Sequence, residues 1–213
     1  MKTISASQIQ QMLAHVANTV IASKEMLTDA DRNIGDGDHG IGMANGFEAA
    51  LKELVVRQFD DAYALFSTVG RTMIKVMGGA SGIIFGLLFY AGAKNMPPKA
   101  ELSTTEFVEI FEKALAEIQV KGQAKLGDKT LVDGLSPMVT AMKTAVAAGG
   151  DFKEILAKGK LAAIEGKEAS KQYVARFGKA KTLGERAVGF PDAGCVSLTV
   201  IASAMSEWAD QNL

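Results

Sequence analysis

Apolar residues recur at every third or fourth position through most of the chain, and no segment alternates apolar and polar residues as a β-strand would. This spacing predicts about eight helices and an all-α fold. With 213 residues and 48% hydrophobic content, the chain suits one domain over residues 1–213 with a sizeable core. The first helix is expected to reach Asp31, and the seventh to reach Tyr173. The predicted helices start at or just after Ser5, Gly40, Asp60, Gly82, Ser103, Asp133, Asp151 and Gly194, and S-T-T-E at 103–106 is a capping box for the fifth of them.

Four non-helical stretches interrupt this periodicity, and each contains glycine: residues 31–42, 78–82, 122–133 and 178–194. Each falls where one pair of helices gives way to the next. In an up-and-down bundle, turns at that interval gather at one end. The sequence therefore predicts that one end of the molecule is rich in loops and glycine.

The first of these stretches, D-R-N-I-G-D-G-D-H-G-I-G, gathers the carboxylates of Asp31, Asp36 and Asp38. Carboxylates held close together repel one another and oppose folding unless a cation lies between them. Oxygen ligands alone select a hard ion, Mg²⁺ or Ca²⁺. The alternative is a solvated acidic turn, because Asp and Gly are ordinary turn residues.

Familiar loop motifs do not fit this stretch. Gly35, Gly37 and Gly40 form a literal G-x-G-x-x-G, but no strand precedes it and two Asp lie between its glycines. An EF-hand loop that began at Asp36 would place Phe47 where the bidentate Glu belongs. The chain also lacks a Walker A sequence and a protein-kinase catalytic loop, which excludes the two common phosphoryl-transfer architectures.

The other three stretches each allow a ligand-binding and a purely structural interpretation. Residues 78–82, G-G-A-S-G, form either a phosphate cradle with Ser81 as a donor or a tight turn between helices. The charged residues of 122–133 are either indirect partners of the acidic loop or part of a capped, solvated turn. The basic residues of 178–194 either face a phosphate or lie in solvent. These charged residues are Asp128, Lys129 and Asp133, followed by Lys179, Lys181 and Arg186.

Composition narrows the range of partners. Twenty-three basic and 24 acidic residues leave a net charge of −1, so no overall field attracts nucleic acid or an anionic membrane. The single cysteine, Cys195, excludes an internal disulfide and fits a reducing compartment. The longest apolar run, residues 82–93, is too short to span a bilayer, and the opening residues lack a signal-peptide core. We expect a cytoplasmic protein with no nucleic-acid or membrane partner.

One end of the bundle would thus combine three Asp with Mg²⁺, glycine-rich backbone amides and a few cations. A nucleoside diphosphate or triphosphate requires this combination.

Four motifs, in this order, resemble the ADP-binding subunits of bacterial dihydroxyacetone kinases. They are residues 31–39 with Gly46 and Phe47, residues 78–82, G-D-K-T at 127–130, and L-G-E-R at 183–186 leading to D-x-G at 192–194. The resemblance covers nearly the whole chain. It implies a barrel of eight antiparallel helices that holds ADP or ATP with two Mg²⁺ at one end, and a phosphotransferase that is active only with partner subunits.

Matching by position, the resemblance implies two sets of site residues and no catalytic residue. For His39 the alternative is a capping or packing role. The implied Mg²⁺ ligands are Asp31, Asp36 and Asp38, and the implied nucleotide contacts are His39, Gly40, Ile41, Gly42, Ala80, Ser81, Gly122, Leu131, Lys179, Asp192, Ala193 and Gly194.

The chain departs from the family pattern at three places. Gly42 stands where Asn or Thr is usual, Lys179 stands where an Arg reaches the phosphates, and residues 190–193 read F-P-D-A instead of H-Q-D-P. A Lys is a point charge and does not reproduce the planar two-pronged contact of an Arg. We therefore expect altered nucleotide affinity or exchange, or another short ketose as substrate.

The resemblance also implies the partners. One partner subunit holds the ketose covalently on a histidine, and a phosphohistidine subunit of the phosphotransferase system rephosphorylates bound ADP. Two alternatives stay open: a subunit of an ATP-dependent kinase that acts on another short ketose, and a nucleotide-sensing module that binds a transcription regulator.

Overall fold

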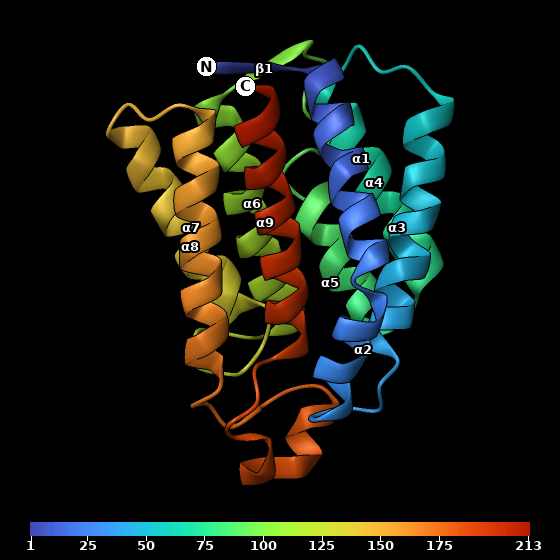
Figure 1. Cartoon of the computed structure of the whole chain (residues 1–213), viewed down its shortest axis with the longest axis vertical. Helices are drawn as coiled ribbons and strands as arrows, with labels where there is room; N and C mark the ends of the chain where they lie inside the picture. Colours follow the sequence, from blue (N-terminus) through green and yellow to red (C-terminus); the bar gives the residue numbers. More distant parts are fainter.

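The computed structural model describes all residues of the chain and is almost entirely helical (Figure 1). The long helices lie side by side, and both chain termini are at the end opposite a short 3₁₀ segment, η1. The elements are β1 (Thr3–Ser5), α1 (Ala6–Ala22), α2 (Lys24–Arg32), α3 (His39–Val56), α4 (Ala62–Met77), α5 (Gly79–Tyr90), β2 (Glu101–Ser103), α6 (Thr104–Gly122), α7 (Val132–Ala147), α8 (Phe152–Ser170), η1 (Lys179–Ala187) and α9 (Ala193–Asn212).

The helices close into a barrel. Each long helix from α3 to α9 packs against the next one along the chain, and α1 packs against both α3 and α9. If α1 and α2 are taken as one interrupted helix, eight helices form this ring, which confirms the all-α barrel expected from the sequence. The apolar faces meet in one core of 51 buried residues. The core includes edge-to-face and tilted ring pairs among Phe66, Phe107, Phe111 and Phe152.

The end of the barrel that carries the chain termini, which we call the closed end, is held by local polar contacts. β1 and β2 pair antiparallel with Ile4 opposite Leu102, and each strand runs directly into the N-cap of a long helix. The Ser103–Glu106 capping box predicted at the start of α6 is present, and Ser5 caps α1 in the same way.

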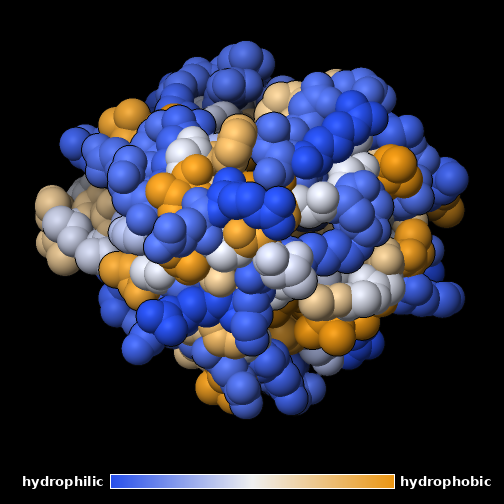
Figure 2. All heavy atoms as spheres, turned by 90° about the horizontal axis from the view of Figure 1, so that it is seen from below, coloured by the Kyte–Doolittle hydropathy of each residue, from blue (hydrophilic) through white to orange (hydrophobic).

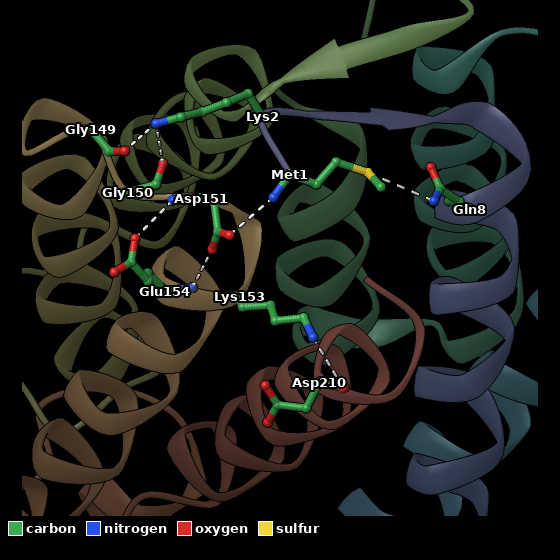
Figure 3. Close-up of polar contacts among 9 residues, drawn as sticks. All are labelled: Met1, Lys2, Gln8, Gly149, Gly150, Asp151, Lys153, Glu154 and Asp210. Atoms are coloured by element: carbon green, nitrogen blue, oxygen red, sulfur yellow. Dashed lines mark hydrogen bonds and ion pairs between the residues drawn. The ribbon is translucent and has the colours of Figure 1, made fainter.

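The N-terminal residues join this end to α8 (Figure 3). The Met1 ammonium lies 3.0 Å from Asp151 Oδ2, and Lys2 Nζ donates a hydrogen bond to the Gly149 carbonyl. Asp151 is also the N-cap of α8, and its capping box with Glu154 is complete. The first amides of α1, α6 and α8 at the closed end therefore have partners in neighbouring side chains.

Local details differ from the sequence prediction. The first helix breaks at Ser23, whose hydroxyl donates to the Thr19 carbonyl, so α2 is a separate helix that ends just past Asp31. α8 ends at Ser170, before Tyr173, and α5 already begins at Gly79. The two strands were not predicted, because three residues are too few to show an alternating pattern. No helix combines the length and apolar character needed to cross a membrane.

Candidate functional site

At the opposite, open end, a cavity of about 950 Å³ brings together the four stretches that interrupt the helices. Figure 2 views the molecule from this end, where hydrophilic residues are interspersed with residues of intermediate and high hydropathy. The predicted gathering of these stretches is thus present. The lining includes residues from 31–42, the turn between α4 and α5, the loop between α6 and α7, and the segment that leads into α9.

The carboxylates of Asp31, Asp36 and Asp38 converge at one side of the cavity, with one oxygen from each lying within 4.8 Å of the others. The backbone dictates this arrangement. Asp31 Oδ2 accepts hydrogen bonds from the amides of Gly37 (2.9 Å) and His39 (3.3 Å), which wraps the loop around its carboxylate. Gly37 has a left-handed φ of 77°, a conformation that glycine adopts at no steric cost.

Lys179, at the start of η1, points its ammonium at this cluster. It pairs with both Asp36 and Asp38, and the second contact is 3.3 Å long. A cation thus already lies against two of the three carboxylates. The cluster therefore has the donor set of a hard-cation site and is placed to accept positive charge.

His39 opens α3 and is buried between the cavity and the core. Its Nε2 lies 2.7 Å from Ser197 Oγ, and its ring is 5.6 Å from that of Phe85. Burial lowers the pKa of His39, and the negative charge of Asp31 opposes this only in part. The neutral imidazole is therefore the favoured form, and the residue both packs and lines the cavity.

The turn between α4 and α5 faces the cavity with its backbone. Gly78 and Gly79 have φ values of 65° and 59°, and a Cβ at either position would meet nothing within 4 Å. Glycine is therefore needed there for its conformation and not for close packing. The first amides of α5 have no partner within the helix, and Ser81 lies beside them on the cavity wall. Such a helix start favours an anion.

An apolar wall that the sequence analysis missed completes the cavity. Its members lie on α5, on α6 and just before η1, and Ile83 remains 48% exposed. One feature of the sequence indicated this wall: α5 is apolar on every side, whereas packing against the core buries only one face of a helix. The wall consists of Ile83, Ile84, Phe85, Ile118 and Phe177.

The charged residues of 122–133 do not contact the acidic loop, which corrects the idea that they are its indirect partners. Asp133 accepts hydrogen bonds from the amides of Gly127 (2.5 Å) and Thr130 (2.7 Å) and so holds its own loop closed. Asp128 accepts from the Lys125 amide and pairs with Arg176. Lys129 is buried and donates to carbonyls of the α8–α9 connection.

Asp192 caps α9, with its Oδ2 accepting from the Cys195 amide at 2.8 Å. Burial of the carboxyl group raises the pKa of Asp192 to about 6. A titratable group that lines a cavity with a shifted pKa is typical of functional sites.

Most residues implied by the family resemblance line the cavity, whereas Gly40 does not. A Cβ at Gly40 would lie 2.3 Å from the Lys24 carbonyl, so this glycine lets α2 and α3 approach. Lys181 and Arg186 are exposed and lie off the cavity wall. The predicted residues on the wall, whose ligand contacts stay a prediction, are Asp31, Asp36, Asp38, His39, Ile41, Gly42, Ala80, Ser81, Gly122, Leu131, Lys179, Asp192, Ala193 and Gly194.

Fold and site together define a closed ring of helices with one open end, where carboxylates, glycine-turn amides and an apolar wall share a cavity. The chain belongs to the DAK2 domain family, whose model matches residues 33–207. This confirms the resemblance carried by the four sequence motifs.

Among its relatives is the ADP-binding subunit of the PEP-dependent dihydroxyacetone kinase of Escherichia coli K12, which is 29% identical over 92% of this chain and 93% of the subunit. The ADP-binding subunit of the PTS-dependent enzyme of Lactococcus lactis is 31% identical over 87% of this chain and 88% of its own. The L-erythrulose kinase of Pectobacterium atrosepticum is 32% identical, but over only 32% of its length.

The fold matches that of the dihydroxyacetone kinase of C. freundii. The native form superposes with a TM-score of 0.73 at 25% identity over 94% of this chain. The complex of that enzyme with AMP-PNP and Mg²⁺ gives a TM-score of 0.72 at 24% identity. This chain spans about a third of the length of those solved chains (34%).

Proposed function

We propose that this chain is the nucleotide-binding subunit of a dihydroxyacetone kinase, a phosphotransferase. It holds ADP or ATP with Mg²⁺ in the open-end cavity while a partner subunit presents the ketose. The observation that carries the proposal is the shared cavity, which combines a three-carboxylate cluster, the glycine turn at the start of α5 and an apolar wall. Family membership and relatives named as ADP-binding subunits support it.

Each part of the cavity suits one part of a nucleotide. The apolar wall around Ile83 and Phe177 offers a surface for a base, and the free amides at Gly79 and Ala80 face the region where phosphates would lie. Asp31, Asp36 and Asp38 would hold Mg²⁺, and we expect two ions. When bound, Mg²⁺ neutralises negative charge on the phosphoryl oxygens.

The chain supplies orientation and charge and not a base. Burial lowers the pKa of His39, which makes its imidazole a weaker base, and its Nε2 is already hydrogen-bonded to Ser197, so it is poorly suited to accept a proton from a substrate hydroxyl. A metal ion held by Asp36 and Asp38 would compete with the Lys179 ammonium for their oxygens, and that ammonium would then be available to a phosphate. Proton transfer from the ketose is therefore assigned to the partner subunit.

We infer that the phosphoryl donor is a phosphohistidine subunit of the phosphotransferase system. The support is that relatives matching over most of both chains are PEP-dependent or PTS-dependent by name. The buried thiol of Cys195 suits the cytoplasm, where we place the reaction. An ATP-exchanging kinase for another short ketose is the second candidate, favoured by the 32% identity to an L-erythrulose kinase and by Lys179 in place of Arg.

The nucleotide retained after purification tests this proposal. The protein is dialysed extensively with Mg²⁺ and then denatured, and the released nucleotide is identified. About one ADP per chain supports a retained coenzyme, because only a complex with slow dissociation outlasts dialysis. An empty chain that binds ATP reversibly supports the exchanging kinase. Failure to bind either nucleotide contradicts both versions. Nucleotide binding without phosphoryl transfer to a ketose-bearing partner indicates a sensor, the form that a transcription regulator would bind.

A further inference from the structure

The connection between α8 and α9 is a long excursion that leaves the barrel at Ser170 and returns at Asp192. It carries η1, and with it the Lys179 ammonium that faces the acidic cluster. Its two ends meet at the base: the Asp192 amide donates to Ser170 Oγ (3.0 Å), and the Gly189 amide donates to the Lys171 carbonyl (2.8 Å). Where Lys179 points therefore depends on how this base is held.

Lys129 holds the base from a different part of the barrel. Its side chain is 2% exposed, and its Nζ donates to the Ser170 carbonyl at 2.7 Å and to the Phe190 carbonyl at 2.5 Å. One ammonium thus links both ends of the excursion to the loop between α6 and α7. No carboxylate pairs with it at ion-pair distance.

This arrangement is costly for the protein. A buried ammonium without an ion-pair partner loses its hydration, and burial lowers the pKa of Lys129 despite the opposing charges of Asp192 and Asp133. Lys129 also has a φ of 59°, a left-handed conformation that non-glycine residues rarely adopt. An apolar residue at this position would avoid the charge penalty, and a glycine would avoid the strain. Both costs are retained for a side chain that reaches the two carbonyls.

The position of Lys129 connects it to the site. It lines the cavity, and the excursion that it ties down contributes Lys179 near one end and leads into Asp192, Ala193 and Gly194 at the other. We propose that Lys129 is a positioning residue: by clamping the base of residues 171–191, it directs Lys179 toward the phosphate and metal region and so strengthens nucleotide binding. This inference rests on the proposed function.

The test compares Lys129→Met with Lys125→Met. Methionine keeps an unbranched apolar stem and removes the donors, and Lys125 is an exposed lysine on the same loop, so its replacement makes the same change in charge. We expect Lys129→Met to weaken ADP binding in Mg²⁺ about tenfold in calorimetry and to speed amide hydrogen exchange across residues 171–191. Lys125→Met should change neither. If Lys129→Met does not fold, Lys129→Gly replaces it, because glycine adopts the left-handed conformation without strain.

A double-mutant cycle separates positioning from a general structural role. If Lys129 acts by directing Lys179, the double variant Lys129→Met/Lys179→Met should bind ADP within about twofold of the weaker single variant. Multiplied losses would mean that the two lysines act independently and would overturn the inference. Butylammonium should restore ADP binding to Lys129→Gly, whereas sodium chloride at equal ionic strength should not.

The outcomes distinguish this inference from the proposed function. Wild-type binding of ADP together with unchanged affinity and unchanged exchange in Lys129→Met overturns the inference alone. A wild-type chain that binds neither ADP nor ATP overturns the proposed function and this inference with it.

Discussion

The two ends of the barrel differ in how far their polar groups find partners within the chain. At the closed end, capping boxes bind the first amides of α1, α6 and α8, and β1 pairs with β2. Met1 pairs there with Asp151, the N-cap of α8 (Figure 3). At the open end, Gly78 and Gly79 leave the first amides of α5 without partners in the helix, and three carboxylates crowd together. The barrel is thus fastened at one end, and the other end is available for a ligand.

This contrast predicts a division of effects. Variants at the closed end should lower the free energy of unfolding and leave nucleotide affinity unchanged. Variants of Asp36 and Asp38 at the open end should instead weaken nucleotide binding and leave the free energy of unfolding unchanged. A closed-end variant that weakens nucleotide binding without loss of stability would contradict this division most directly.

The largest effect is expected from Asp36→Asn. Loss of one of three charges should weaken Mg²⁺-dependent nucleotide binding by about 100-fold or more, the upper range seen when even indirect metal partners are removed. The helical circular dichroism should stay unchanged, because Asp36 is exposed and caps no helix. Calorimetric titration measures the affinity, with exposed Asp60→Asn as the control. Unchanged affinity would refute the metal role of the cluster.

Two neighbouring glycines of α3 offer a matched pair. A Cβ at Gly40 would lie 2.3 Å from the Lys24 carbonyl, so Gly40→Ala should destabilise the protein by about 1–3 kcal/mol through overpacking. At Gly42 the nearest atom is Met77 Cε at 4.0 Å, so Gly42→Ala should stabilise α3 by up to about 1 kcal/mol. Urea unfolding measures both. Equal effects would mean that the contact between α2 and α3 is looser than the structure has it.

At the closed end, Asp151→Ala removes the N-cap of α8 and the partner of the Met1 ammonium. We expect a loss of about 1–2 kcal/mol, the usual value for a strong N-cap, with no change in ADP affinity. Asp151→Asn serves as the control, since it keeps the cap and loses only the charge. A drop in affinity without a loss of stability would break the division between the ends.

Two pH dependences of stability with opposite signs are also expected. Burial raises the pKa of Asp192 from 3.8 to about 6, so the native state binds more protons than the unfolded state between these values, and stability falls as pH rises from about 4 to 6. A hydrogen bond from Lys99 lowers the pKa of Glu106 from 4.5 to about 2, so its contribution is lost as pH falls through that range.

When the urea midpoint is measured against pH, Asp192→Asn should remove the dependence between about pH 4 and 6. Glu106→Gln should remove the dependence between about pH 2 and 4.5. If Asp192→Asn leaves the slope between pH 4 and 6 unaltered, the carboxyl group of Asp192 is not buried as described.

Much of the fold was predictable because its signals are local. The 3.6-residue spacing of apolar residues located the helices, and the Ser103–Glu106 box marked the start of α6. Asp31, Asp36 and Asp38 lie within eight consecutive residues, so their convergence needed no knowledge of distant segments. The four helix breaks predicted a shared end of the barrel, and the cavity lies there.

Only the tertiary structure decided which residues face that cavity from the helices. Ile83 and Phe85 look alike in an evenly apolar helix and both line the cavity, yet packing leaves the first 48% exposed and the second 2%. Gly40 and Gly42 belong to the same motif, yet α2 covers one and leaves the other on the cavity wall. The sequence allowed Lys129 to be part of a solvated turn or an indirect partner of the acidic loop, whereas in the structure it is buried against the α8–α9 connection. The physical reason is that periodicity reports on a single element, whereas burial and hydrogen-bond partners depend on chain segments that are distant in sequence.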